Sequence, residues 1–103
     1  MRLLVMFDLP VGDKAERKEA AKFRNFLLKD GFYMMQFSVY VRICNSLEAA
    51  QMHLNRVQAS LPREGSVRAL IITENQFTNM KVLCGERNKD FDKNQQDDLI
   101  TVI

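Results

Sequence analysis

Residues 2–8, RLLVMFD, constrain the fold most, because they alternate with the period of a β-strand. The odd-numbered residues lie on one face of such a strand, and the even-numbered Leu4 and Met6 lie on the other. The following LPVGD contains Pro and Gly and is typical of a loop. We therefore expect a strand that is apolar on both faces. The face expected to pack against helices carries Leu3, Val5 and Phe7.

Helical and extended periods alternate along the rest of the chain. Asp13 followed by Glu16 is typical of a helix start, and Asp30-Gly31 is typical of a helix stop. In the next run one side is expected to be apolar, with Phe37, Val39, Val41 and Ile43, and the other polar, with Gln36, Ser38, Tyr40 and Arg42. A second apolar repeat at intervals of three and four follows. The expected elements are a strand at 2–8, a helix at 14–29, a strand at 32–44, a helix from Asn45 or Ser46 to Leu61, a strand at 66–74, a turn at 75–79 and a short strand at 80–84.

This order predicts an α+β fold if the long strand at 32–44 can take two places in the sheet. A strand over 32–44 exceeds the usual 5–6 residues. It can therefore bend at its middle and supply two strands of the sheet, or pair as a hairpin. The result is a ferredoxin-like (β-α-β-β-α-β) sandwich, with two helices on one face of an antiparallel sheet. We expect this core over residues 1–84 and a tail over 85–103.

Such a sandwich leaves one sheet face open, and in this chain that face is apolar. Leu4, Met6, Leu70 and Ile72 are expected there. Because so apolar a face is unfavourable in water, we expect a two-fold homodimer that covers it. The apolar residues 99–103 are expected to form a strand that adds to a sheet edge, that of the partner subunit.

Asp8 is the strongest candidate for chemistry, since it ends the first strand at a loop. One carboxylate is a weak Mg²⁺ site. Two copies of Asp8 brought together by a two-fold axis, with a substrate phosphate, could complete a site. The alternative is that Asp8 accepts backbone N–H groups in the loop, and the sequence leaves both interpretations open.

The first helix is rich in cations. Lys14, Lys18 and Lys22 repeat every four residues and form one basic stripe, which could bind phosphates without reading sequence. An ordinary solvated helix face remains the alternative. His53 falls off the apolar stripe of the second helix and is expected on the surface. The residues expected to contact nucleic acid are Lys14, Arg17, Lys18, Lys22, Arg24 and Arg42.

Length and charge restrict the class of function. The 103 residues have room for one domain, and no apolar run reaches the roughly 20 residues of a membrane span. The N-terminus is too briefly apolar for a signal peptide, so we expect a cytoplasmic protein without membrane association. Residues 1–84 carry 12 Lys and Arg against 8 Asp and Glu, whereas residues 85–103 carry 3 against 5. A basic body favours an anionic partner.

Four stretches carry a family resemblance: MRLLVMFDLP at the start, KFRNFLLKDGF around the end of the first helix, QFSVY in the long strand and LPREGSVR after the second helix. Together they closely resemble the CRISPR-associated Cas2 endonuclease family, in the variant found with type II systems. The resemblance covers roughly residues 1–87. It implies a ferredoxin-like fold, a homodimer with an exchanged C-terminal strand, and a Mg²⁺ ion bound at the aspartate that ends strand one, here Asp8.

The resemblance implies two functions. One is a Mg²⁺-dependent endonuclease of single-stranded RNA or double-stranded DNA, with Asp8 as its catalytic residue. The other is the central dimer of the Cas1–Cas2 integrase, which inserts new spacers and holds duplex DNA by its backbone. Phe7 stands where the family often has tyrosine, which weakens the case for efficient hydrolysis. A non-catalytic scaffold, a toxin-like endoribonuclease and an RNA-recognition domain are the alternatives, and the last lacks aromatic residues in VRALII.

Overall fold

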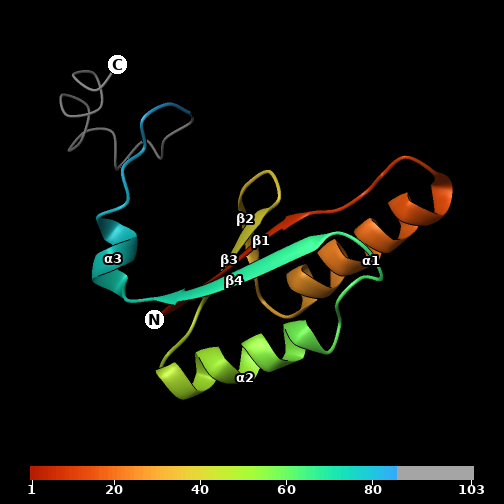
Figure 1. Ribbon diagram of the computed structural model, residues 1–103. Coiled ribbons are helices and arrows are strands. Elements are labelled where there is room, and N and C mark those ends of the chain that lie inside the picture. Colours follow the sequence, from red (N-terminus) through yellow and green to blue (C-terminus); the bar gives the residue numbers. More distant parts are fainter. Residues whose placement is uncertain (86–103) are drawn as a thin grey trace.

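The computed structural model describes residues 1–85 and shows three helices and four strands in that part of the chain (Figure 1). No helix within these residues combines the length and the apolar character needed to cross a bilayer. The elements are β1 (Arg2–Asp8), α1 (Lys14–Lys29), β2 (Tyr33–Gln36), β3 (Val39–Ile43), α2 (Leu47–Gln58), β4 (Ser66–Ile72) and α3 (Glu74–Thr78).

The sheet has the strand order β2-β3-β1-β4. β1 lies in its interior and pairs antiparallel with both β3 and β4. The hairpin of β2 and β3 is followed by α2, which returns the chain to the far side of β1, where β4 pairs. This order is the ferredoxin-like arrangement expected from the sequence, and the prediction of that fold is confirmed.

The single long strand expected over 32–44 is in fact two strands. Its middle turns at Phe37 and Ser38, and Gln36 pairs with Val39 across the turn. Ser38 has a φ of 63°, a left-handed conformation that residues other than glycine rarely adopt. The expectation that this run could bend and supply two strands is therefore correct. The expectation that its side chains alternate between the two faces without interruption through residues 36–39 is wrong.

The expected turn at 75–79 and the expected strand at 80–84 are wrong. Residues 74–78 form α3, and no strand is present over 80–84. Thr73 accepts from the Gln76 backbone, and the Gln76 side chain accepts from Thr73 N–H, a capping box that starts the helix. The predicted strand at 99–103 lies outside the described residues, as does nearly all of the predicted tail.

The core lies between the sheet and the helices α1 and α2, which cover one of its faces (Figure 1). Leu3, Val5 and Phe7 point into this core, as expected. The Phe7 ring meets the Phe23 ring edge-on at 5.3 Å and stacks on the Tyr40 ring at 5.6 Å, both measured between centroids. Tyr40 was expected on a polar face, and this is wrong: its pairing with Val5 turns it toward the helices. The core side chains supplied by the helices are Ala20, Phe23, Leu27, Ala50 and Val57.

A buried polar contact joins the end of α1 to α2. Asp30, the C-cap of α1, is buried, and its Oδ2 lies 2.8 Å from His53 Nδ1. Its Oδ1 lies 2.7 Å from a guanidinium nitrogen of Arg56. The expectation that His53 lies on the surface is wrong, because Asp30 at the helix end requires polar partners in the interior.

We predict that His53→Leu destabilises the fold. Leucine keeps most of the volume but leaves Asp30 Oδ2 without its buried partner, which costs about 1–3 kcal/mol. Urea unfolding measures the change, with the exposed Gln51→Leu on the same helix as the control. Equal stability of the two variants would show that the Asp30–His53 contact contributes nothing.

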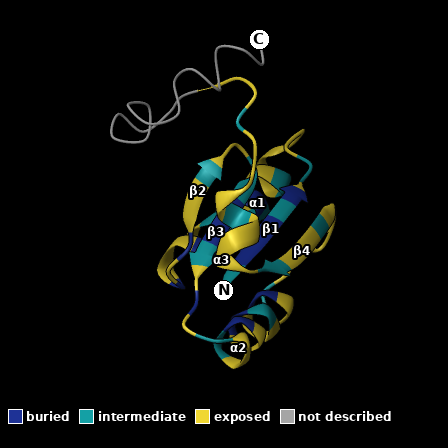
Figure 2. Ribbon diagram, turned by 90° about the vertical axis from the view of Figure 1, so that its left-hand side faces the viewer, coloured by how far each residue is buried: buried dark blue, intermediate teal, exposed yellow. Residues whose placement is uncertain are grey.

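α3 is held at the end of the sheet where β1 begins (Figure 2). Arg2 donates to both carboxylate oxygens of Glu74, at 2.9 Å from Nε and 3.1 Å from Nη2. The same guanidinium lies 4.1 Å from the centroid of the Phe77 ring and donates to the Tyr33 hydroxyl. Arg2 therefore connects β1, β2 and α3.

The Arg2–Glu74 contact makes the docking of α3 depend on pH. The hydrogen bond from Arg2 holds the pKa of the Glu74 carboxyl below its usual value. Because a lowered carboxyl pKa stabilises the folded contact above the usual value of about 4.3, we predict that the contact is lost as the pH falls through the lowered pKa. The Arg2 side-chain NMR signals, shifted by the Phe77 ring, measure this loss. Glu74→Gln should remove the pH dependence and Glu64→Gln should not; the reverse result would contradict the assignment.

Candidate functional site

The open face of the sheet lies opposite α1 and α2. The strand register places the even-numbered residues of β1 on it, together with Val41, which pairs with Leu4, and Leu70, which pairs with Leu4 from the other side. Leu70 is 52% exposed and Ile43 is 53% exposed. Of the four residues expected on this face, only Leu70 is exposed: Leu4 is buried at 6%, and Met6 and Ile72 are half-buried. Within the described residues the face is therefore less open than expected, and α3 contacts its Arg2 end.

Asp8 ends β1 on this open face, at the end away from α3. Its backbone pairs with Ser66 of β4, while its side chain is exposed. Within residues 1–85 the carboxylate forms no ion pair and no hydrogen bond. The alternative that it accepts N–H groups of its loop is not supported by these contacts, because the N–H groups of Gly12 and Asp13 donate to Glu16 instead.

The backbone at Asp8 is held by a close approach of the loop between α2 and β4. A Cβ atom on Gly65 would lie 2.8 Å from the Asp8 carbonyl oxygen and 2.7 Å from Leu9 Cδ2. Gly65 also has a φ of 106°, which favours glycine. Only glycine therefore allows this loop to pass so near the end of β1.

Arg68 lies on the open face beside Asp8. It pairs with Met6, and it stands two residues beyond Ser66, the partner of Asp8. Diagonal neighbours of this kind lie roughly 7–8 Å apart in an antiparallel pair. Arg68 is exposed and has no ion-pair partner within residues 1–85. Arg68 was not among the site residues expected from the sequence, although its alternation with Leu70 and Ile72 carried the signal.

The basic stripe of α1 is exposed. Lys14, Lys18 and Lys22 make no ion pair within the described residues. Arg17 is also exposed and donates to the Val11 carbonyl. These four cations are accessible to a phosphate backbone.

Arg24 and Arg42 are less accessible than the lysines of the basic stripe on α1. Arg24 is half-buried. Arg42 pairs with Leu3 and so faces the helices rather than the polar side expected for it. Its guanidinium donates to the Asp30 carbonyl at 2.9 Å and to the Ile43 carbonyl. Arg42 is thus engaged in holding the end of α1.

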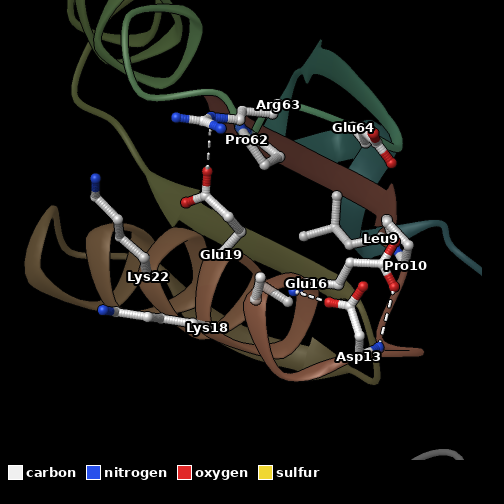
Figure 3. Close-up of a pocket in the computed structure, with 12 residues that line it drawn as sticks. Leu9, Pro10, Asp13, Glu16, Lys18, Glu19, Lys22, Pro62, Arg63 and Glu64 are labelled. Carbon is white, nitrogen blue, oxygen red and sulfur yellow. Dashed lines mark hydrogen bonds and ion pairs between the residues drawn. The ribbon is translucent and has the colours of Figure 1, made fainter.

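A groove of about 520 Å³ separates α1 from the loop before β4 (Figure 3). Arg63 and Glu19 face each other across it, with 3.8 Å between their charged atoms. Lys18 and Lys22 extend away from Leu9 and Pro10, so cations lie at the rim. Because acidic and basic side chains alternate along the lining, the groove does not carry a charge of one sign.

The residues described do not form a complete metal site. No group of three His, Cys, Asp or Glu side chains within residues 1–85 could hold a metal ion. Asp8 alone supplies one hard oxygen ligand of the kind that Mg²⁺ prefers, and it is free to do so. A Mg²⁺ ion therefore fits only if further ligands come from a second copy and from a substrate phosphate.

The fold and site define a small ferredoxin-like α+β domain with an exposed carboxylate on an open, partly apolar sheet face. The family model of CRISPR associated protein Cas2 matches residues 1–80. The chain belongs to this family, and the resemblance drawn from its sequence is confirmed.

Similar proteins carry the name CRISPR-associated endoribonuclease Cas2. The one from Acidovorax ebreus is 59% identical over 85 residues, which cover 82% of this chain and 83% of that protein. The one from Campylobacter jejuni is 54% identical over 85 residues, but these cover only 59% of its length. The one from Ligilactobacillus salivarius is 46% identical, with 87% of this chain and 89% of that protein covered.

A solved structure shares the fold. The crystal structure of Streptococcus pyogenes Cas2 at pH 6.5 superimposes with a TM-score of 0.60 and covers 82% of this chain and 100% of that one. At 20% identity this likeness supports the fold and carries no residue roles.

We predict that Gly65→Ala displaces Asp8. The added Cβ collides with the Asp8 carbonyl in a backbone conformation that alanine disfavours, at a cost of about 1–3 kcal/mol. The amide signals of Asp8 and Leu9 should move, and thermal unfolding should occur at lower temperature. The control is Gly85→Ala, since Gly85 has a φ of 130° but no atom within 4 Å of its Cβ position. Equal effects of both variants would contradict the role of crowding.

Proposed function

We propose that this protein is a Mg²⁺-dependent endonuclease of CRISPR adaptation that works as a homodimer in the cytoplasm. The exposed carboxylate of Asp8, held at the end of β1 without an ion-pair partner in residues 1–85, carries this proposal. A carboxylate in that state is available to a metal ion, whereas one engaged in the loop would not be.

The apolar open face supports the homodimer. Leu70 and Ile43 are each about half exposed on the same face as Asp8. A two-fold contact through such a face buries these side chains and brings two copies of Asp8 toward one another. Asp8 lies at the opposite end of β1 from α3, so α3 does not separate the two carboxylates.

Each side chain has a separate role in this proposal. Asp8 would hold the ion, which when bound supplies charge stabilisation at the scissile phosphate and acidifies a bound water. Arg68 lies beside it and would neutralise an adjacent phosphate. The exposed stripe of Lys14, Lys18 and Lys22, together with Arg17, would hold the backbone further along.

The substrate proposed is single-stranded RNA or double-stranded DNA. The name endoribonuclease, carried by the relatives, supports RNA. The toxin-like endoribonuclease considered from the sequence has no observation of its own in its favour. An RNA-recognition domain is disfavoured, because the open-face residues of β4 are Arg68, Leu70 and Ile72, none of them aromatic.

A non-catalytic scaffold is the second candidate. As the central dimer of the Cas1–Cas2 integrase, the protein would hold double-stranded DNA through its cations while the Cas1 partner performs strand transfer. The observation that favours it is the single carboxylate at the site, since no group of three metal-binding side chains occurs in residues 1–85. The absent hydroxyl at Phe7 does not decide between the two, since that ring is buried on the helix face, opposite Asp8.

We predict that Asp8→Asn abolishes Mg²⁺-dependent cleavage. The amide keeps the shape but loses the charge that binds the ion, so turnover should fall by at least about 100-fold. Purified protein with labelled single-stranded RNA or duplex DNA, with Mg²⁺ and with EDTA, measures the change. Glu48→Gln, an exposed carboxylate on α2, serves as the control.

The same variants separate the two functions. Cleavage that requires Mg²⁺ and Asp8 supports the endonuclease. No cleavage by the parent protein, with duplex binding and spacer acquisition that survive Asp8→Asn, supports the scaffold and refutes the endonuclease. A monomer at micromolar concentration in sedimentation experiments would contradict the homodimer on which both depend.

A further inference from the structure

Phe37 is the most exposed large apolar side chain of the described residues. It stands at the tip of the β2–β3 hairpin and is 85% exposed. No other aromatic ring approaches it within the described residues, where the ring pairs involve Phe7, Phe23 and Tyr40. Packing within residues 1–85 therefore gains almost nothing from this ring, and the stability of this part of the chain does not explain its presence.

The turn that presents Phe37 is strained and anchored. The next residue, Ser38, occupies the left-handed region at a φ of 63°, which costs a residue other than glycine free energy. The Ser38 carbonyl accepts from Phe7 N–H at 3.0 Å. This bond ties the tip of the hairpin to β1 at the residue that precedes Asp8. The hairpin tip and the end of β1 lie side by side in Figure 1.

Three chemically different groups thus gather at one end of the sheet. Asp8 supplies an exposed carboxylate, Arg68 an exposed cation, and Phe37 an exposed aromatic ring. A nucleotide presents the complementary groups, namely a phosphate that binds cations and metal, and a base with an apolar face. Aromatic side chains stack on unpaired bases without regard to sequence.

We propose that Phe37 is a stacking platform for an unpaired nucleobase of the strand whose phosphate lies at Asp8. The inference rests on the proposed endonuclease function and makes its substrate specific. A base inside a duplex is already stacked on its neighbours, so this platform selects single-stranded nucleic acid, or an unpaired end, over duplex.

The chain contains no tryptophan, which allows a direct test. In Phe37→Trp the only indole would report on the platform, and the high exposure of the site means that the larger ring requires no repacking. Titration with a short single-stranded RNA in EDTA, where cleavage does not occur, should quench the tryptophan emission. The matched duplex at the same nucleotide concentration should leave it nearly unchanged.

Binding measurements complete the test. Phe37→Ala should weaken the affinity for single-stranded RNA by about tenfold, and Phe37→Tyr should bind like the parent protein. Raised salt should weaken phosphate contacts but leave the ratio between the affinities of the parent protein and the Phe37→Ala variant nearly constant, since stacking is not ionic. Met34→Ala, at an exposed residue on the same hairpin, serves as the control and should also bind like the parent.

The outcomes distinguish failure of the Phe37 platform from failure of the proposed endonuclease function. The platform is supported if single-stranded RNA, but not duplex, quenches the emission of Phe37→Trp and if Phe37→Ala binds single-stranded RNA more weakly than the parent protein. If single-stranded RNA binds and is cleaved through Asp8 while emission and the Phe37→Ala affinity stay unchanged, the platform is refuted and the endonuclease stands. Quenching by duplex as strongly as by single strands also refutes it. If no nucleic acid binds at all, both fail.

Discussion

The pairing of β1 with a strand on each side is the constraint on which the structure depends. As an interior strand, β1 fixes the registers of β3 and β4 at once. Its odd-numbered side chains fill the core beneath α1 and α2, and its even-numbered ones form the centre of the open face. One strand thus determines which face is buried and where Asp8 emerges. The two ends of β1 then serve different purposes: Arg2 holds α3, and Asp8 makes no ion pair within residues 1–85.

Most of the fold could be predicted because its signals are local. Alternation in β1, the capping pair Asp13 and Glu16, and the stop at Asp30-Gly31 each depend on residues close in sequence. The length of the run at 32–44 indicated a bend at its middle, but the position of the turn at Phe37 and Ser38 could not be predicted, since the turn contains neither glycine nor proline and the alternation continues through it. α3 was missed for another reason: five residues are too few to show a helical period, although Thr73 and Gln76 carried a capping signal.

The candidate site was predicted in part. Asp8 was found because a carboxylate at the end of an apolar strand contradicts the local pattern. The positions of Arg42 and His53 were not found, because both are set by the buried end of α1, a tertiary feature that no sequence period reports. Arg68 and Gly65 lie near Asp8 only through the β1–β4 register, which pairs residues far apart in the chain. Long-range pairing is what the sequence alone leaves undetermined.

The interior position of β1 also has a kinetic consequence. Arg2 pairs with Ile72, so β1 can pair with one of its two neighbouring strands only after synthesis has passed residue 72, close to the end of the described residues. Contacts so distant in sequence close slowly, because the loop entropy is lost before the contacts form. Until β4 arrives, the apolar edge of a partial sheet stays exposed to other nascent chains. Substitutions that weaken β4 should therefore reduce the yield of native protein during synthesis more than they reduce its stability once folded.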